Sequence, residues 1–150
     1  MKIALGTDHR GYEQKEFIKE RLFGKALEIL DLGSFSGERS DYPFFAKEVC
    51  TAIQKGYAQQ GILWCGSGVG MSIAANRFAG IHAALVWTEE IARLAKSDDN
   101  ANVLVFPADF ISTERTIACI NVWLETTFKG NHYENRLQTI DAWGGIGSKL

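Results

Sequence analysis

This sequence lacks a large excess of charge of either sign, long apolar runs and paired cysteines. The formal net charge of −2 gives no reason to expect nucleic acid or a membrane surface as a partner. No apolar run approaches the length of a membrane span. The first apolar residues meet Asp8 and His9 too early to form the core of a signal peptide. We therefore expect neither a membrane protein nor a secreted one.

The cysteines also indicate the cellular compartment of the protein. Cys50, Cys65 and Cys119 are odd in number, and their spacing is not that of a metal site. A reducing cytoplasm is therefore expected, and no metal ligands are predicted. Since neither a repeat nor a linker-like stretch divides the chain, residues 1–150 are predicted to form a single domain.

Apolar segments of strand length alternate with helical segments along the chain. Strands are predicted at residues 2–6, 26–32, 61–65, 82–87 and 103–106. Helices are predicted at residues 12–23, from Pro43 onward, from residue 67 or 69 to 78, and at 89–96, 113–128 and 132–143. This alternation implies parallel strands with right-handed crossovers. The predicted fold is therefore α/β, a doubly wound, Rossmann-like parallel sheet of about five strands with helices on both faces.

The stretch Gly61–Asn76 carries the clearest chemical signal. An apolar run ends at Cys65, three glycines follow at alternate positions, and a helical pattern then begins. The backbone N–H groups of such a turn can bind an anion, and they favour the thiolate form of a cysteine. We therefore predict that Cys65 is a functional thiol, with a small buried core residue as the alternative.

Other polar residues follow the other predicted strands. Asp8, His9 and Arg10 come after the first strand, residues 34–41 after the second and residues 107–109 after the fifth. Because ligands of such sheets bind beyond the carboxyl ends of the strands, these groups should share one rim with Cys65. The loop after Cys65 lacks the last glycine of a dinucleotide fingerprint. Nor does the first loop have the lysine and hydroxyl pair of a P-loop, so neither nucleotide site is favoured.

Four segments together resemble the type B ribose-5-phosphate isomerases, whose superfamily includes the galactose-6-phosphate isomerase subunits. These segments are residues 8–11, 38–43, 64–76 and 100–104, and the resemblance extends over essentially the whole chain. It implies a cofactor-independent aldose–ketose isomerisation of an open-chain sugar phosphate through an enediol. It also implies a homodimer or a dimer of dimers with shared active sites, in which the C-terminal helix reaches a partner subunit.

The resemblance assigns roles to individual residues. Cys65 would move a proton between C1 and C2. Ser67 and the backbone of Gly66, Gly68 and Gly70 would stabilise the enediolate. Asp8 would bind the substrate hydroxyls or relay their protons, and His9 would face the phosphate. The other substrate contacts that we predict are Arg10, Tyr42, Asp99, Asn100, His132 and Arg136.

Three residues depart from the pattern of the ribose-type members. Asp98 stands where those members carry the histidine that opens the furanose ring, and we predict it as a catalytic residue in that place. His132 replaces the first arginine of the last helix, and Asp109 replaces the arginine that follows the fifth strand in many members.

These departures leave the substrate open among ribose 5-phosphate, a tetrose phosphate and a hexose phosphate. A tetrose phosphate needs no ring opening, and the galactose-type relatives also lack the histidine. Two other functions stay possible on the sequence. One is a non-catalytic sugar-phosphate or nucleotide-binding module, and the other is one subunit of a hetero-oligomeric galactose-6-phosphate isomerase.

Overall fold

The computed structural model describes residues 1–22 and 24–149, and five strands in it form one parallel sheet. The strand order is β2-β1-β3-β5-β4. The strands are β1 (Lys2–Thr7), β2 (Glu28–Asp31), β3 (Gln60–Cys65), β4 (Ala83–Leu85) and β5 (Val103–Pro107). The winding direction reverses between β1 and β3, the place where sheets of this kind bind ligands. The predicted doubly wound α/β fold is therefore confirmed.

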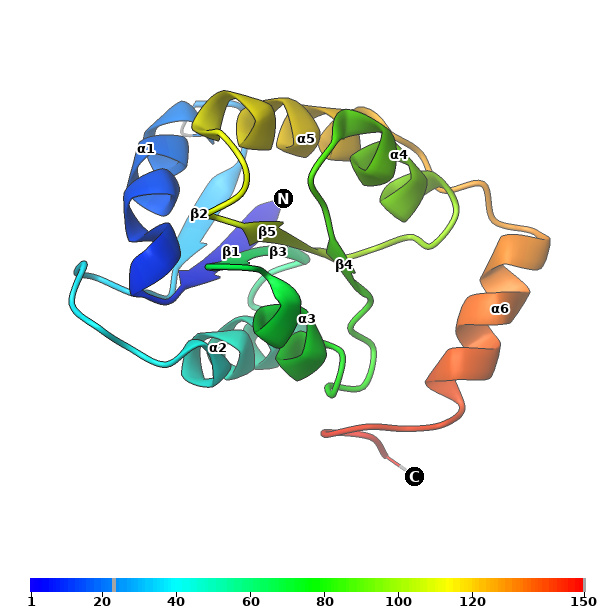
Figure 1. The fold of residues 1–150 in the computed structure, drawn as a ribbon. Helices are drawn as coiled ribbons and strands as arrows, with labels where there is room; N and C mark the ends of the chain where they lie inside the picture. The colour runs from blue at the N-terminus through cyan, green and yellow to red at the C-terminus, as the bar shows by residue number, and fades with distance from the viewer. Residues whose placement is uncertain (23, 150) are drawn as a thin grey trace.

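Helices pack on both faces of the sheet (Figure 1). One face is covered by α1 (Tyr12–Leu22), α4 (Glu89–Ser97) and α5 (Thr113–Glu125), and the other by α2 (Tyr42–Gln54) and α3 (Val69–Ala75). Alternate residues of a strand point to opposite faces, so Leu104 and Phe106 join the first core while Val103 and Val105 join the second. Because both faces are covered, β3 and β5 are buried along their whole lengths.

Several predicted elements are longer than the observed ones, for local reasons. Ala26 has a φ of 58°, so β2 begins only at Glu28. Thr126 takes an extended conformation, which ends α5 at Glu125 rather than at residue 128. The helix α1 is described as far as Leu22, and the predicted last residue, Phe23, lies outside the described residues. A short 3-10 helix, η1 (His9–Gly11), which was not predicted, precedes α1.

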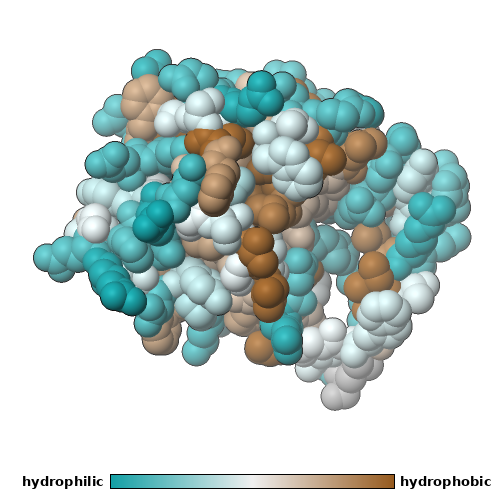
Figure 2. Space-filling view, in the orientation of Figure 1, coloured by the Kyte–Doolittle hydropathy of each residue, from teal (hydrophilic) through white to brown (hydrophobic). Residues whose placement is uncertain are grey.

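The C-terminal helix α6 (His132–Asp141) lies beside the body of the protein and not on the sheet (Figure 1). Its end is held by Asp141, whose carboxylate lies 2.7 Å from His82 Nε2. Farther on, Ile146 pairs with Phe78. A cavity of about 340 Å³ separates Leu137 and the neighbouring part of the helix from the body, and Figure 2 shows an opening there. In the described part of the chain, no helix has the length and apolar character needed to cross a membrane.

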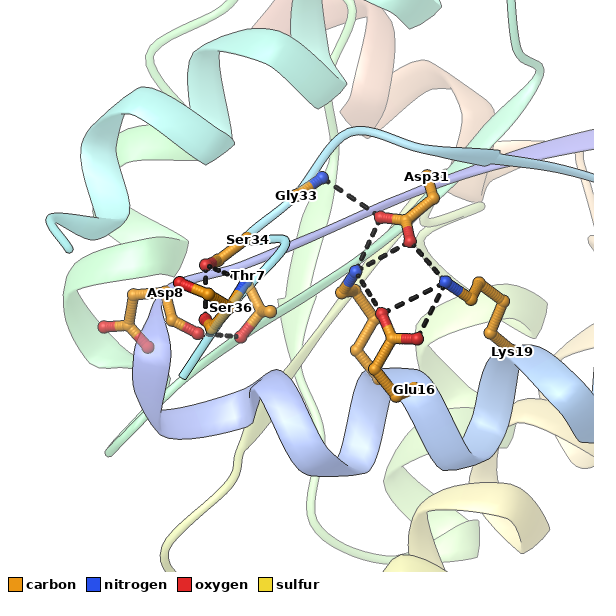
Figure 3. A network of polar contacts seen from close by, with 9 residues as sticks. Thr7, Asp8, Glu16, Lys19, Asp31, Gly33, Ser34 and Ser36 are labelled. Atoms are coloured by element: carbon orange, nitrogen blue, oxygen red, sulfur yellow. Dashed lines mark hydrogen bonds and ion pairs between the residues drawn. The ribbon is translucent and has the colours of Figure 1, made fainter. Parts of the chain in front are cut away.

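A buried ion-pair network joins α1 to β2 (Figure 3). The Lys15 side chain is fully buried, and its Nζ lies 2.6 Å from Asp31 Oδ1 and 3.0 Å from Glu16 Oε1. Lys19 Nζ lies 2.7 Å from Asp31 Oδ2. Asp31 also accepts the backbone N–H of Gly33, so the network anchors the start of the loop that leads to the rim. Buried charges are tolerated in this way only when they are paired.

Candidate active site

Cys65 ends β3 beside the point where the winding reverses, and only 5% of it is exposed. The glycine turn that follows brings the N–H groups of Met71, Gly68 and Ser67 towards its sulfur, where they favour the thiolate. Gly68 has a φ of 76°, a conformation that favours glycine. A side chain at Gly68 would also collide with Leu85. The turn is thus built for close contact between backbone donors and one sulfur atom.

Two opposing effects set the pKa of the Cys65 thiol. Burial raises the pKa of its thiol, and the charge of Asp8 adds to this, although the N–H groups of Met71 and Gly68 act in the opposite direction. The N–H groups therefore favour a thiolate as predicted, but desolvation outweighs them. The pKa of Cys65 therefore lies above its ordinary value, and the role of Cys65 as a functional thiol stays a prediction.

Asp8 is the second buried acid of this rim, with 6% of the residue exposed. Its Oδ1 accepts the backbone N–H of Arg10 at 2.9 Å and so caps η1. Burial raises the pKa of Asp8, while this hydrogen bond and the charges of His9 and Arg10 partly oppose the shift. The charge of Asp8 also acts on Cys65, so two interacting groups with raised pKa values lie at this rim, a feature typical of catalytic sites.

His9 is held at the rim by the loop before α2. Its Nδ1 lies 3.2 Å from both the backbone N and the backbone O of Ser40, so the tautomer decides which of the two it pairs with. Among the described residues, Nε2 has no hydrogen-bond partner, which leaves it available to a ligand. The side chain of Ser67 also keeps a hydrogen-bonding group available to a ligand. Its Oγ accepts the N–H of Val69 at 3.2 Å, and its hydroxyl hydrogen can still be donated.

Tyr42 and Gly70 are in contact, but the contact has a packing role. A Cβ atom at Gly70 would lie 2.5 Å from the ring of Tyr42. Glycine at this position therefore allows α2 and α3 to approach each other closely. The predicted contact of Tyr42 with a substrate is not tested by this geometry and stays a prediction.

Arg10 also lies at the rim, paired with Asp109 from the loop after β5. Its Nε donates to Asp109 Oδ1 at 3.2 Å, and its Nη2 donates to Asp109 Oδ2. The pair lies directly on the glycine turn, because a Cβ atom at Gly66 would come within 2.9 Å of Asp109 Oδ2 and 3.6 Å of Arg10 Nε.

Asp98, Asp99 and Asn100 lie at the opposite end of the strands, where the amino ends of the parallel strands meet. We call this end the amino edge of the sheet and the end with Cys65 the carboxyl edge. The three residues follow the C-terminal end of α4 and precede the first residue of β5, Val103, which pairs with the start of β3. With a rise of about 3.3 Å per residue, that edge lies roughly 13 Å from Cys65 along the strand. The Asp98 carboxylate accepts hydrogen bonds from Lys129 and Ser97, each at 2.8 Å, and these bonds lower its pKa. Within one chain, these predicted residues do not join Cys65.

The predicted residues of α6 are separated from Cys65 as well. His132 stacks on Tyr133 with ring centroids 4.3 Å apart, and the Arg136 guanidinium lies 5.3 Å from the centre of the Tyr133 ring. The helix lies beyond β4, at the edge of the sheet, whereas β3 is central. His132 and Arg136 therefore stay predictions that require a second chain.

Comparison with known proteins identifies the family. A sequence model described as Ribose/Galactose Isomerase matches residues 3–140. The chain belongs to this family. It is 38% identical over 141 residues to ribose-5-phosphate isomerase B of Escherichia coli strain K12, with 94% of this chain and 95% of that protein covered.

Solved structures of ribose-5-phosphate isomerases agree with the family assignment. The enzyme from Thermotoga maritima matches with a TM-score of 0.91 and 46% identity, covering 94% of this chain and 97% of that one. The enzyme from Mycoplasma genitalium, solved with bound ribulose 5-phosphate, matches with a TM-score of 0.91 and 36% identity, covering 95% of each chain. The family predicted from the sequence is confirmed.

For this member of the ribose/galactose isomerase family, the structure adds one contact to the predicted rim. Asp109 was expected there as a residue that follows the fifth strand, and the structure pairs its carboxylate with Arg10 above the glycine turn. Its position after a strand that pairs with β3 was the available signal, since residues at neighbouring carboxyl ends meet.

Proposed function

We propose that this chain interconverts an aldose phosphate and a ketose phosphate through an enediolate, without a cofactor. The observation that carries the proposal is the pairing of a buried thiol and a buried carboxyl group, both with raised pKa values, under a turn of backbone N–H donors. A reaction of this kind needs a base at the carbon beside a carbonyl and donors for the oxygen that gains charge. The family membership and the relative solved with ribulose 5-phosphate support the same chemistry.

The geometry suggests an order of proton movements. The thiol of Cys65 first gives its proton to the neighbouring carboxylate of Asp8. The thiolate then takes the proton from C2 of the open-chain aldose, and the charge that develops on O1 is stabilised by the Ser67 hydroxyl and the N–H groups of the turn. Asp8 returns a proton to O1 and accepts the one from the C2 hydroxyl. Cys65 finally delivers its proton to C1, which completes the ketose.

We further propose that two copies of the chain share each site. Apolar side chains gather over α3 (Figure 2), and Val69, Ile73 and Trp87 are 52%, 58% and 49% exposed, which favours burial against another protein surface. A second copy could then supply Asp98, Asp99, Asn100, His132 and Arg136, which one chain keeps away from Cys65. A homodimer or a dimer of dimers in the cytoplasm is the assembly that we propose.

Assays of the purified chain against a panel of tetrose, pentose and hexose phosphates test this function. We expect ketose formation from at least one aldose phosphate, and its loss in Cys65→Ala. Ribose 5-phosphate, a tetrose phosphate and a hexose phosphate are all candidates, because Asp98 replaces the ring-opening histidine of the ribose-type pattern.

The panel also separates the alternatives. Tight binding of a sugar phosphate without turnover of any compound would favour a non-catalytic binding module. Activity that appears only after a different protein is added would favour a subunit of a hetero-oligomeric enzyme. Undiminished turnover by Cys65→Ala would contradict the proposed mechanism.

A further inference from the structure

Arg10 and Asp109 come from loops on opposite sides of β3, and their ion pair spans the glycine turn between them. Asp109 is anchored there by its own backbone. Its N–H donates to Gly66 O at 3.0 Å, and the N–H of the preceding residue, Ala108, donates to Cys65 O at 2.9 Å. The carboxylate is thus fixed relative to the reactive thiol, and the guanidinium is fixed relative to the carboxylate.

The guanidinium of Arg10 keeps unused donors in this arrangement. Arginine has five N–H donors, and the Asp109 carboxylate takes one from Nε and one from Nη2. The described residues supply no other hydrogen-bond acceptor to the Arg10 guanidinium, and 53% of the Arg10 side chain is exposed. The free edge of the guanidinium matches the geometry of a phosphate group, which arginine can bind with two parallel hydrogen bonds.

We propose that Arg10 binds the phosphate group of the substrate and that Asp109 is the residue that positions it. This inference rests on the proposed function, because it assigns a place to the phosphate of the sugar phosphate. The phosphate then lies beside His9, on the side of the site formed by the loop after β1. Because the Arg10–Asp109 pair has no net charge, it attracts a phosphate less strongly than Arg10 alone would. Asp109 instead holds the guanidinium of Arg10 in a fixed orientation.

Binding of inorganic phosphate to the purified chain tests the role of Arg10 by calorimetry. We expect Arg10→Gln to weaken this binding about 10- to 100-fold, because a charge-assisted hydrogen-bond pair is lost. Arg10→Lys should recover only part of the loss, since an ammonium group keeps the charge but cannot make the two parallel bonds. A change of less than about twofold in Arg10→Gln would overturn the proposal.

The chain offers a matched control on the surface of α4. Arg93 pairs with Glu90 through its Nε at 3.2 Å and its Nη2 at 2.6 Å, in the same geometry as Arg10 with Asp109. The variant Arg93→Gln removes an equal charge outside the rim. It should leave phosphate binding unchanged, and an equal loss in Arg93→Gln would attribute the Arg10 effect to overall charge and overturn the proposal.

The variant Asp109→Asn tests the positioning role through two readouts of opposite sign. Phosphate should bind about three- to tenfold more tightly, because the neighbouring negative charge is gone. With the sugar phosphate that the wild type converts best, kcat should fall about tenfold, because the amide holds only one N–H of the guanidinium. A merely structural role for Asp109 would weaken both quantities together, and that result would overturn the proposal.

Failure of the proposed function is a separate outcome. If the wild type converts no sugar phosphate, the isomerase proposal fails. Calorimetry with inorganic phosphate still decides the role of Arg10 in that case, because that measurement does not depend on turnover. Unchanged phosphate binding in Asp109→Asn, with or without turnover, counts against the positioning role.

Discussion

The two edges of the sheet carry polar groups of different character. At the carboxyl edge, Asp8 and Cys65 are buried, and burial raises the pKa of both. At the amino edge, Asp98 is half-buried and paired, and the hydrogen bond from Lys129 lowers its pKa. Asn102 has a structural role there, because its Oδ1 accepts the backbone N–H of His82 and its Nδ2 donates to Gly80 O, each at 2.9 Å. Groups that can change their charge during a reaction therefore gather at one edge of a single chain.

After Cys65→Ala, the largest effect expected from a change at the carboxyl edge is that of Asp8→Asn. Asparagine can still accept the Arg10 N–H and cap η1, but it cannot take up a proton. We expect kcat to fall about 100- to 1,000-fold, the usual contribution of a general acid or base. Steady-state kinetics checks this, with the melting temperature as the control for folding. A stable variant with kcat within threefold of the wild type would remove Asp8 from the mechanism.

The network around Lys15 sharpens the comparison, because the Lys15 side chain is buried and yet its ammonium group is paired. Asp31→Ala should lower the free energy of unfolding by about 3 kcal/mol, since it leaves the buried Lys15 ammonium without its main partner. Denaturant titration measures this loss. Lys2→Ala, at the exposed ion pair with Glu28, is the control and should cost less than about 1 kcal/mol.

The same network has a defined pH dependence. Although burial opposes it, hydrogen bonds from Lys15 and Lys19 lower the pKa of Asp31. A lowered pKa stabilises the fold fully above the unfolded-state value of about 3.9, and the gain disappears as the pH falls through the lower folded-state value. The difference in unfolding free energy between wild type and Asp31→Ala should therefore narrow below about pH 4. A difference that stays constant down to pH 2 would contradict this assignment.

Residues of the amino edge and of α6 can take part in the reaction only if two copies of the chain share a site. A mixture of two variants, each with low activity alone, tests this. Cys65→Ala and Arg136→Ala should each have low activity. If sites are shared, a mixed dimer contains one intact site, so co-refolded variants should regain up to about a quarter of wild-type activity. No recovery from a mixture in which mixed dimers are demonstrated would place Arg136 outside the partner's site.

The smallest expected effect is on the pH profile. In the proposed mechanism Asp8 accepts the proton of Cys65, so Asp8 must be deprotonated before the reaction starts. Burial raises the pKa of Asp8, and this carboxylate therefore takes up a proton from solvent at a less acidic pH than an ordinary one. We expect kcat/KM to fall severalfold from pH 7 to pH 5. A kcat/KM that rises over this interval would contradict the proposed proton transfer.

Much of the fold could be predicted from the sequence, because its determinants are local. The central strands β3 and β5 are short apolar runs with polar or glycine residues at their ends, and each is a strand in the structure. Edge strands were harder to delimit. Strand β4 spans only Ala83–Leu85 at the edge of the sheet, whereas a strand over residues 82–87 was predicted.

The rim was predicted in outline, since Cys65, Asp8 and His9 each follow a strand. Two features were missed because they arise only in the folded chain. Burial by neighbouring elements decides the pKa of Cys65, and a local motif does not report burial. The partner of Arg10 is 99 positions away in the sequence, so no spacing rule connects it with Asp109.

The central claim is that Cys65 carries a proton between C1 and C2. It can be tested by following, in ²H₂O by NMR, the exchange of the C2 hydrogen of the sugar phosphate that the wild type converts. We expect the wild type to introduce deuterium over many turnovers. Cys65→Ala should still bind the sugar phosphate but exchange this hydrogen at less than about one-thousandth of the wild-type rate. Exchange by Cys65→Ala at a rate near that of the wild type would contradict the assignment of Cys65 as the base.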